Sequence, residues 1–481
     1  MMTASVSSLH TEHPEVAEMQ RVFDLQKAAF KARPNPSASE RLTALDNLKK
    51  ALIKYQDQIA QAIADDFGHR SHQETKFAEI LTSLDNIKYY SKNLKTWMQP
   101  EKRHVNPTHL PAKAWVQHQP LGVVGIITPW NYPLLLAISP LICALAAGNR
   151  AMIKMSSFTP KTGLTLKRAL AEAFSEDQVA VVTGGGVVSD AFSRLPFNQL
   201  TFTGSTNVGR TVMAAAAENL TPVLLELGGK SPAIIHASVP MKDAAEKLSL
   251  GKCWNAGQTC VAPDYVFIPK GKTAEFVAAM RSAVSKMYPS MLNNPDYTSI
   301  VNNKQYSRIQ GYLEDAKEQG ATIIEINPAN ESFSNTRKMP VTLVANVKQS
   351  MQITKNEIFG PVLMMLEYEH LEEAIDYIAE RPSPLALYYF DYDEERADFV
   401  LRNTQSGGYS VNDVLTHVAE EDLPFGGVGH SGMGKYHGKE GFAAMSNARS
   451  VLVKPKFWSM KFLAPPFNSP LHKIIEKVLL K

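Results

Sequence analysis

Two residues of this sequence, Cys260 and Glu226, have side chains and surroundings suited to covalent catalysis. Cys260 ends the run Asn-Ala-Gly-Gln-Thr-Cys at 255–260, and Glu226 opens the run Glu-Leu-Gly-Gly-Lys at 226–230. The small residues in both runs let backbone and ligand approach closely. A thiol can act as a nucleophile and a carboxylate as a base. Such a pair is what a chain needs to oxidise an aldehyde through a covalent thioester.

Each residue also has an ordinary structural interpretation. A buried cysteine usually behaves as a small hydrophobic residue, and we expect this of Cys143 and Cys253. Cys260 differs because Gly, Gln and Thr precede it, which favours a thiol exposed at a cleft. Glu226 follows the apolar run 223–225 and precedes a glycine pair that permits backbone geometry closed to other residues, but it could simply face solvent. If it shares a cleft with Cys260, desolvation would raise its pKa enough to activate a water near neutral pH.

Two further segments are suited to binding. Gly204-Ser205-Thr206-Asn207-Val208-Gly209 follows an expected strand and opens an expected helix, where free N–H groups attract phosphate. The segment departs from the dinucleotide fingerprint GxGxxG, because Thr206 stands at the second glycine. Asn131 lies between Pro129 and Pro133, which fix the local φ angles and could give a hydrogen-bond donor a rigid mount. Taken alone, that segment could also be a plain turn.

The elements that must position these residues alternate between helix and strand, as in an α/β protein. Residues 17–98 have helical periodicity, and 104–120, with three prolines, predicts an extended arm or edge strand rather than a core strand. The next part predicts a doubly wound, dinucleotide-type sheet up to about residue 225. Its expected strands are 122–127, 151–154, 179–183, 199–203 and 223–226, and its expected helices are 134–147, 160–174 and 208–218.

A second α/β unit is expected to follow, with strands at 233–235 and 265–268 and helices at 241–255 and 273–287. From Leu423 the tail has neither strong periodicity nor a clear core of its own. Near its end, Leu471, Ile474, Ile475 and Val478 share one face of a short helix, which favours docking on protein over attachment to a membrane surface. We therefore expect three parts: 1–225 with the N-terminal helices, the dinucleotide-binding domain and the arm; 226–412 as the catalytic domain; and 413–481 as an oligomerisation and docking tail.

Composition narrows the function classes. The 50 Lys and Arg against 47 Asp and Glu leave a formal net charge of +3 with no long basic run, so nucleic acid is not an expected partner. Three cysteines without CxxC spacing predict neither a disulfide framework nor a metal site, and they fit a cytoplasmic location. The polar N-terminal residues lack the apolar segment of a secretion signal. Prolines interrupt the apolar stretch 121–153, so no membrane span is expected.

Five motifs, in order and at compatible spacings, resemble those of the aldehyde dehydrogenase superfamily. They are Pro129-Trp130-Asn131, Phe202-Thr203-Gly204-Ser205, Glu226-Leu227-Gly228-Gly229-Lys230, Gly257-Gln258-Thr259-Cys260 and Glu357-Ile358-Phe359-Gly360-Pro361. The resemblance covers about residues 20–455. The short N-terminus and the segment 423–438 look like the class-3 and fatty-aldehyde branch. Within it, the segments 260–265, 384–390 and 417–424 look most like bacterial coniferyl aldehyde dehydrogenases.

The resemblance implies a role for each candidate residue. Cys260 would attack the aldehyde carbon, the Asn131 amide and the Cys260 N–H would hold the oxyanion, and Glu226 would activate the hydrolytic water. NAD or NADP would accept the hydride, with Gly204 to Gly209 along its pyrophosphate. Glu357 would bind the nicotinamide ribose and Phe359 would pack beside the ring. The resemblance also places Trp130 at the cofactor and Lys154 at the adenosine ribose, and it implies a symmetric homodimer paired through the arm and the tail.

Ser157 departs from the family pattern, which has Lys-Pro-Ser-Glu where this chain has Lys-Met-Ser-Ser at 154–157. The usual glutamate would repel the 2′-phosphate of NADP, whereas serine does not. We therefore expect both NAD and NADP to be accepted.

Two rival functions remain at this point. A CoA-acylating aldehyde dehydrogenase would pass the thioester to coenzyme A, but such relatives typically lack the base that Glu226 provides. A catalytically silent binding protein on the same fold is the other alternative, which the joint presence of Cys260, Glu226 and Asn131 disfavours.

Overall fold

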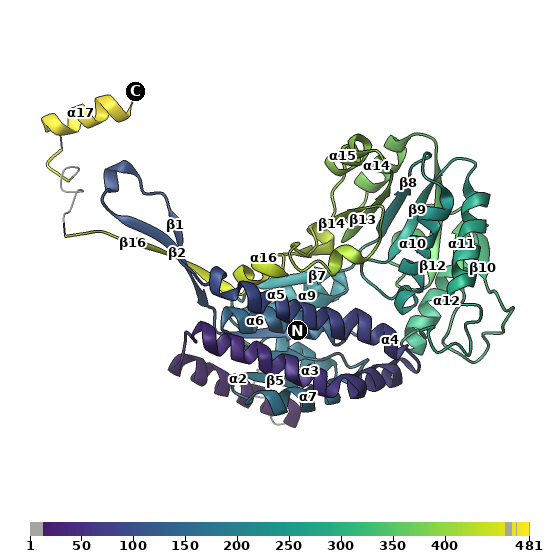
Figure 1. The fold of residues 1–481 in the computed structure, drawn as a ribbon, viewed down its shortest axis with the longest axis horizontal. Helices are drawn as coiled ribbons and strands as arrows, with labels where there is room; N and C mark the ends of the chain where they lie inside the picture. The colour runs from purple at the N-terminus through teal and green to yellow at the C-terminus, as the bar shows by residue number, and fades with distance from the viewer. Residues whose placement is uncertain (1–12, 457–463, 468, 481) are drawn as a thin grey trace, which may run out of the picture.

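The computed structural model describes residues 13–456, 464–467 and 469–480. Two mostly parallel sheets, each with helices packed against it, form the body of the chain, and a narrow three-stranded sheet projects from that body (Figure 1). The α/β architecture expected from the sequence is confirmed. The division of the chain at residues 225 and 412 stays a prediction.

The first sheet has six strands in the order β15-β7-β6-β3-β4-β5. They are β15 (Gly432–Met433), β7 (Val223–Leu227), β6 (Gln199–Gly204), β3 (Val123–Ile127), β4 (Arg150–Lys154) and β5 (Val179–Val182). All neighbours run parallel except β15, which pairs antiparallel with β7. The chain order reverses between β3 and β6, and a doubly wound sheet binds ligands at the carboxyl ends of its strands at such a point.

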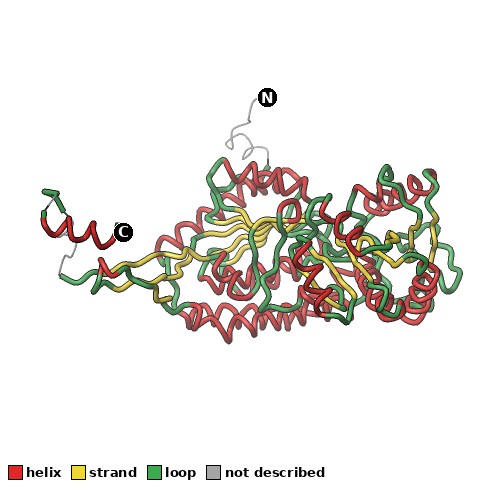
Figure 2. Tube along the Cα trace, turned by 90° about the horizontal axis from the view of Figure 1, so that it is seen from above, coloured by secondary structure: helices red, strands yellow, loops and turns green. Residues whose placement is uncertain are grey.

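Helices cover both faces of this sheet (Figure 2). One face is packed by α2 (Pro14–Ala32), α8 (Gly186–Ser193) and α9 (Thr206–Ala217), and the other by α3 (Ala38–Phe67), α5 (Thr82–Trp97), α6 (Leu135–Ala147) and α7 (Pro160–Ala173). The short helix α4 (His72–Thr75) and the π-helix η1 (Lys76–Leu81) join α3 to α5. Leu45, Leu48 and Leu52 of α3 are fully buried, so the helical periodicity of the N-terminal region correctly predicted a packed face.

The second sheet has seven strands in the order β10-β11-β12-β9-β8-β13-β14, of which β10 is antiparallel. They are β8 (Ser231–Ile235), β9 (Pro263–Pro269), β10 (Thr322–Ile326), β11 (Val341–Ala345), β12 (Val362–Tyr368), β13 (Ala386–Phe390) and β14 (Gly408–Val411). Its helices are α10 (Met241–Cys253), α11 (Thr273–Met287), α12 (Asn303–Glu318), α13 (Gln352–Lys355), α14 (Leu371–Ala379) and α15 (Glu394–Asn403). The expected second α/β unit is confirmed up to residue 287. The elements after that point were not anticipated from the sequence.

The projecting sheet corrects one expectation. It contains β1 (Glu101–Arg103), β2 (Lys113–Pro120) and β16 (Ser446–Val453), with β2 in the centre. Strand β2 is therefore not an edge strand: its partner β16 comes from the far end of the chain and pairs with it over its full length. The prolines did not prevent this pairing because Pro120 is the last residue of the strand and the other two precede it.

The tail after Leu423 is also better ordered than its sequence indicated. Phe425, Tyr436 and Phe442 are at most 6% exposed and join the main core, and α16 (Gly438–Ala444) leads into β16. In the last helix, α17 (Pro470–Leu479), Leu471, Ile474 and Val478 are 41%, 60% and 67% exposed, so the described part of the chain does not cover its apolar face. Among the described residues, no helix is long and apolar enough to cross a membrane.

Candidate active site

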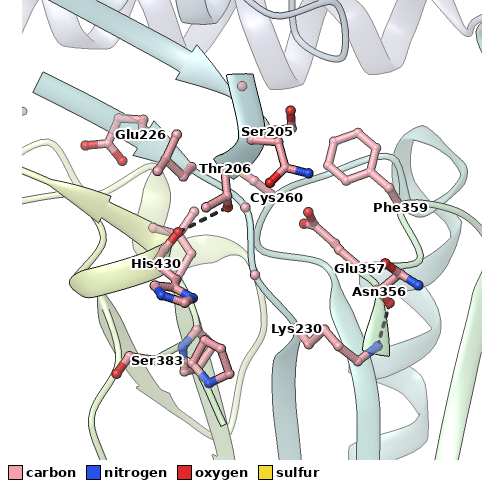
Figure 3. Close-up of a pocket in the computed structure, with 18 of the residues that line it drawn as sticks. Ser205, Thr206, Glu226, Lys230, Cys260, Asn356, Glu357, Phe359, Ser383 and His430 are labelled. Atoms are coloured by element: carbon pink, nitrogen blue, oxygen red, sulfur yellow. Dashed lines mark hydrogen bonds between the residues drawn. The ribbon is translucent and has the colours of Figure 1, made fainter. Parts of the chain in front are cut away.

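The predicted site residues meet in a cavity of about 970 Å³ at the carboxyl ends of the first sheet. Its lining includes Asn131 after β3, Thr206 after β6 and Glu226 from β7, as the switch between β3 and β6 requires. The other wall comes from the second unit and carries Cys260 and Glu357. In the view of Figure 3, Cys260 lies between Glu226 on one side and Glu357 on the other.

The loop before Cys260 has an uncommon backbone. Helix α10 ends at Cys253 rather than at the expected residue 255, because Trp254 is extended, and Asn255, Ala256 and Gly257 then have positive φ of 50°, 49° and 70°. A Cβ on Gly257 would lie 2.3 Å from the Gly360 carbonyl oxygen, and glycine is therefore required there. Burial, followed by the charges of Glu357 and Glu226, raises the pKa of the Cys260 thiol to about 12. A thiol in this environment needs a base or a bound cation to become nucleophilic at neutral pH.

Glu226 is buried within strand β7 and is 2% exposed. Neither carboxylate oxygen has a hydrogen-bond partner among the described residues, and burial raises the pKa of this side chain well above its usual value, although Lys435 opposes the shift. The solvent-facing alternative for Glu226 is therefore wrong. The tail brings Gly426 so close that a Cβ there would lie 2.8 Å from Glu226 Oε1. A buried acid without a partner is unfavourable for folding, and such groups cluster at functional sites.

Asn131 is 3% exposed and is held by hydrogen bonds on both its side chain and its backbone. Its Nδ2 donates to the carbonyl oxygen of Gln258 at 3.2 Å, and its own carbonyl accepts from Asn255 Nδ2 at 2.9 Å. An amide NH₂ group has two hydrogens, so one remains available for a ligand oxygen. The proline-flanked segment is thus more than a turn, because it ties the end of β3 to the loop before Cys260.

The segment after β6 fits a phosphate group. Gly204, Ser205, Thr206 and Asn207 line the cavity, and Ser205 is the N-cap of α9 but makes no side-chain hydrogen bond to that helix. The N–H groups of the first turn are therefore free to meet an anion. Thr206 donates instead to the carbonyl oxygen of His430, which fixes the tail against the helix start (Figure 3). Val208 and Gly209 are in the first turn of α9 but are not part of the cavity lining.

Glu357 and Phe359 form the opposite end of the cavity. Burial raises the pKa of Glu357 to about 8, and the charge of Asp264 adds to this increase. A Cβ on Gly228 would lie 2.1 Å from Glu357 Oε2, whereas the φ angles of Gly228 and Gly229 are not in the left-handed region. Unusual backbone geometry, the expected reason for this glycine pair, is therefore wrong. A side chain at Gly228 would instead displace the Glu357 carboxylate, and one at Gly229 would crowd the backbone of Pro384 and Leu385, 3.2 Å away. The ring of Phe359 contacts that of Trp130 edge-on, with centroids 5.3 Å apart.

Lys154 and Ser157 lie outside the lining of the cavity. Lys154 ends β4 and is 1% exposed, and its Nζ donates to the carbonyl oxygens of Met155 and Gly184 at 2.8 Å each. Burial lowers its pKa to about 8. Ser157 is exposed in the turn that follows. Among the predicted cofactor residues, the cavity lining therefore contains Trp130, Gly204, Ser205, Thr206, Asn207, Glu357 and Phe359, but not Lys154, Ser157, Val208 or Gly209.

Sequence reasoning missed residues that support the site. Lys230 donates to the carbonyl oxygen of Asn356 at 2.9 Å (Figure 3) and pairs with Asp264. Asp264 in turn accepts from the N–H of Ile358 at 2.8 Å. These bonds hold both neighbours of Glu357. Arg70, Glu74 and Glu79 were also missed: all three are at most 9% exposed, but exposed residues such as His72 and Phe77 lie among them, so the sequence carried no signal for their burial.

The cavity has the features that NAD or NADP needs. The N-terminus of helix α9 has no side-chain cap and can meet the pyrophosphate, small residues line the cavity beside it, and a carboxylate is available for a ribose hydroxyl.

The aldehyde dehydrogenase family matches residues 7–451. The chain is 50% identical over 480 residues to a probable coniferyl aldehyde dehydrogenase of Pseudomonas aeruginosa, covering 100% of both chains. It is 43% identical to a coniferyl aldehyde dehydrogenase of a Pseudomonas species, covering 96% of each.

Among solved structures, the substrate-bound state of Staphylococcus aureus AldH superposes with a TM-score of 0.90 at 37% identity, covering 96% of this chain and 99% of the other. The family match extends over most of the chain, and the similarity to the Pseudomonas aeruginosa relative over its full length. This protein is therefore a member of the aldehyde dehydrogenase family, an NAD(P)-dependent oxidoreductase.

Proposed function

We propose that this protein oxidises an aromatic or hydrophobic aldehyde of the coniferyl aldehyde type to its carboxylic acid. The observation that carries the chemical part is the buried, unpartnered carboxylate of Glu226 in the same cavity as Cys260 and Asn131. The full-length similarity to relatives named for coniferyl aldehyde supports the substrate class.

The proposed reaction begins when the Cys260 thiol passes its proton to solvent water and its sulfur bonds to the aldehyde carbon, as the π electrons of the carbonyl bond move to the aldehyde oxygen. The amide of Asn131 and the backbone N–H of Cys260 stabilise the negative charge that develops on the aldehyde oxygen. NAD or NADP supplies the hydride acceptor. Loss of hydride from the former aldehyde carbon leaves a thioester on Cys260.

Glu226 then takes a proton from the water that attacks the thioester carbon. The carbon–sulfur bond breaks, the acid is released and the thiol is restored. A carboxyl group whose pKa lies well above its usual value is better matched to this step than an exposed glutamate, because a base works best near the operating pH. A CoA-acylating enzyme would not need such a base.

Glu357 and the α9 N-terminus would hold the cofactor, with Glu357 on the nicotinamide ribose and Gly204 to Gly209 along the pyrophosphate. Phe359 and Trp130 would pack beside the ring. Lys154 and Ser157 would lie near the adenosine ribose, and the lack of an acidic residue at 157 favours use of both NAD and NADP. The active form would be a homodimer.

The test of the substrate class is a panel of initial rates, followed by the absorbance of the reduced cofactor. Coniferyl aldehyde and a benzaldehyde are compared with straight-chain aldehydes, each with NAD and with NADP and without coenzyme A. We expect kcat/KM for coniferyl aldehyde to exceed that for straight-chain aldehydes by about tenfold, about 1.4 kcal/mol, with the free acid as product. Preference for a straight-chain aldehyde would refute the substrate class, and an absolute need for coenzyme A would refute the hydrolytic step.

A further inference from the structure

Three charged residues, Arg70, Glu74 and Glu79, are buried behind the candidate site on the segment between α3 and α5. Arg70 is 1% exposed, and its guanidinium lies over the rings of Phe67 and Tyr132, 5.4 and 4.8 Å from their centroids. Its Nη1 lies 2.7 Å from Glu79 and its Nε lies 3.5 Å from Glu74. None of the three lines the cavity. Burying an ion pair is unfavourable unless the pair is well aligned and its other polar atoms have hydrogen-bond partners. The contacts of this cluster with the rest of the chain are therefore informative.

The first contacts of the cluster are with the chain around Asn131. Arg70 Nη1 donates to the backbone carbonyl oxygen of Asn131 at 3.2 Å. Glu79 Oε2 accepts from the N–H groups of Leu134 and Leu135, at 2.8 and 3.0 Å, where helix α6 begins. That helix start has no side-chain cap of its own, so Glu79 satisfies it from another element. Glu79 lies in the π-helix η1, a geometry often found at functional sites.

The remaining contact is with the loop before Cys260. Glu74 Oε1 accepts from the backbone N–H of Asn255 at 2.8 Å. Asn255 is the first residue of the left-handed run, and such backbone persists only where surrounding contacts hold it. The side chain of Asn255 in turn donates to the Asn131 carbonyl oxygen, the acceptor that Arg70 also uses. One buried cluster therefore holds both segments that would form the oxyanion site.

We propose that Arg70, Glu74 and Glu79 act as one positioning unit, which sets the Asn131 amide against the Cys260 loop for attack on the aldehyde. The inference rests on the proposed function. The three residues do not line the cavity, so they would act through Asn131 and Asn255. Their contribution is to the alignment of reacting groups, and a displacement of about 1 Å can lower a rate by about a hundredfold.

The variants Arg70→Met and Glu74→Ala each remove one charged side chain of the unit. Glu74→Gln is the conservative partner, because its amide oxygen can still accept from Asn255. Arg41→Met is the matched control: Arg41 is 3% exposed and donates to the carbonyl oxygen of Ala146, at the other end of α6 and away from the cavity. Each variant is assayed as the full chain for thermal unfolding, KM for NAD and the rate of NADH formation in the first turnover.

We expect Arg70→Met and Glu74→Ala to lower the first-turnover rate by at least tenfold with KM for NAD changed less than threefold. Glu74→Gln and Arg41→Met should stay within threefold of wild type in that rate, even where they lower the unfolding temperature. A loss in Arg41→Met as large as that in Arg70→Met would reduce the cluster to ordinary structural stabilisation and overturn the inference. If Arg70→Met does not fold, the contrast between Glu74→Ala and Glu74→Gln decides, and equal rates in that pair would overturn it.

A double-mutant cycle with Asn131→Ala separates this inference from the proposed function. If Arg70 acts through Asn131, then Arg70→Met combined with Asn131→Ala should be no slower than Asn131→Ala alone. If the fold losses in first-turnover rate of the two single variants multiply in the double variant, Arg70 acts on a group other than Asn131. The proposed function would not be affected by that result. An Asn131→Ala variant with the wild-type first-turnover rate would instead remove the oxyanion role on which both proposals depend.

Discussion

Asn131 Nδ2 donates a hydrogen bond to the carbonyl oxygen of Gln258, and this bond joins the two walls of the cavity. Asn131 follows a strand of the first sheet, whereas Gln258 lies in the loop that ends at Cys260. The amide that would stabilise an oxyanion is thereby oriented by the same loop that presents the thiol. The candidate site is consequently one assembly in which neither wall is complete without the other.

Gly228→Ala should weaken cofactor binding. The added methyl group would lie 2.1 Å from Glu357 Oε2, so the carboxylate that we propose to bind the ribose must move. We expect KM for NAD to rise about tenfold with a smaller fall in kcat. Gly311→Ala in α12 is the control, because a Cβ there meets nothing within 4 Å and should change neither constant. An unchanged KM in Gly228→Ala would argue against a cofactor role for Glu357.

Ser157→Glu should shift the cofactor preference towards NAD. A carboxylate at this exposed turn would repel the 2′-phosphate of NADP, and serine does not. Lys154 Nζ already bonds to two carbonyl oxygens, so we expect the preference to depend on residue 157 rather than on Lys154. The measurement is kcat/KM for both cofactors in wild type and variant. If kcat/KM of wild type were about a thousandfold lower with NADP than with NAD, about 4 kcal/mol, the argument would be refuted. It would also be refuted if the ratio of the two kcat/KM values did not change in the variant.

Glu226→Gln should stabilise the fold at neutral and alkaline pH. The folded-state pKa of Glu226 is raised above its unfolded value, so the folded chain keeps a proton that the unfolded chain releases. The stability of wild type therefore falls as the pH rises above about 4.5 towards the folded pKa, and glutamine removes this dependence. We expect an unfolding temperature higher by roughly 1–3 °C at pH 8 and unchanged at pH 4. A variant no more stable than wild type at pH 8 would show that Glu226 is not desolvated.

The chain should form a homodimer. The three-stranded arm projects from the body, and α17 keeps apolar residues exposed that a second copy could cover (Figure 1). Symmetric pairing of identical surfaces is the usual way in which such segments are buried. Sedimentation at micromolar concentration should give twice the chain mass of 53.1 kDa. A species with the mass of one chain would contradict this.

Sequence reasoning succeeded where local pattern and structure agree. The leucines of α3 predicted its buried face, and α6 ends at residue 147 as expected, where Gly148 follows with φ of 90°. It failed where distant segments decide the outcome: β16 makes β2 a central strand, and β15 extends the sheet beside Glu226. For the site, the motifs predicted Cys260, Glu226, Asn131 and seven cofactor residues that line the cavity, but four other predicted residues lie outside its lining. The motifs could not predict the cluster of Arg70, because its contacts with Asn131 and Asn255 exist only in the folded chain.

The proposed chemistry separates formation of the thioester, which needs Cys260, from its hydrolysis, which needs Glu226. Rapid-mixing measurement of NADH formation in Cys260→Ala and Glu226→Gln tests this separation most directly. We predict no NADH from Cys260→Ala, and from Glu226→Gln a first-turnover burst of nearly full amplitude followed by a steady rate at least a hundredfold below wild type, about 2.7 kcal/mol. A normal steady rate in Cys260→Ala, or equal loss of burst and steady rate in Glu226→Gln, would contradict the account.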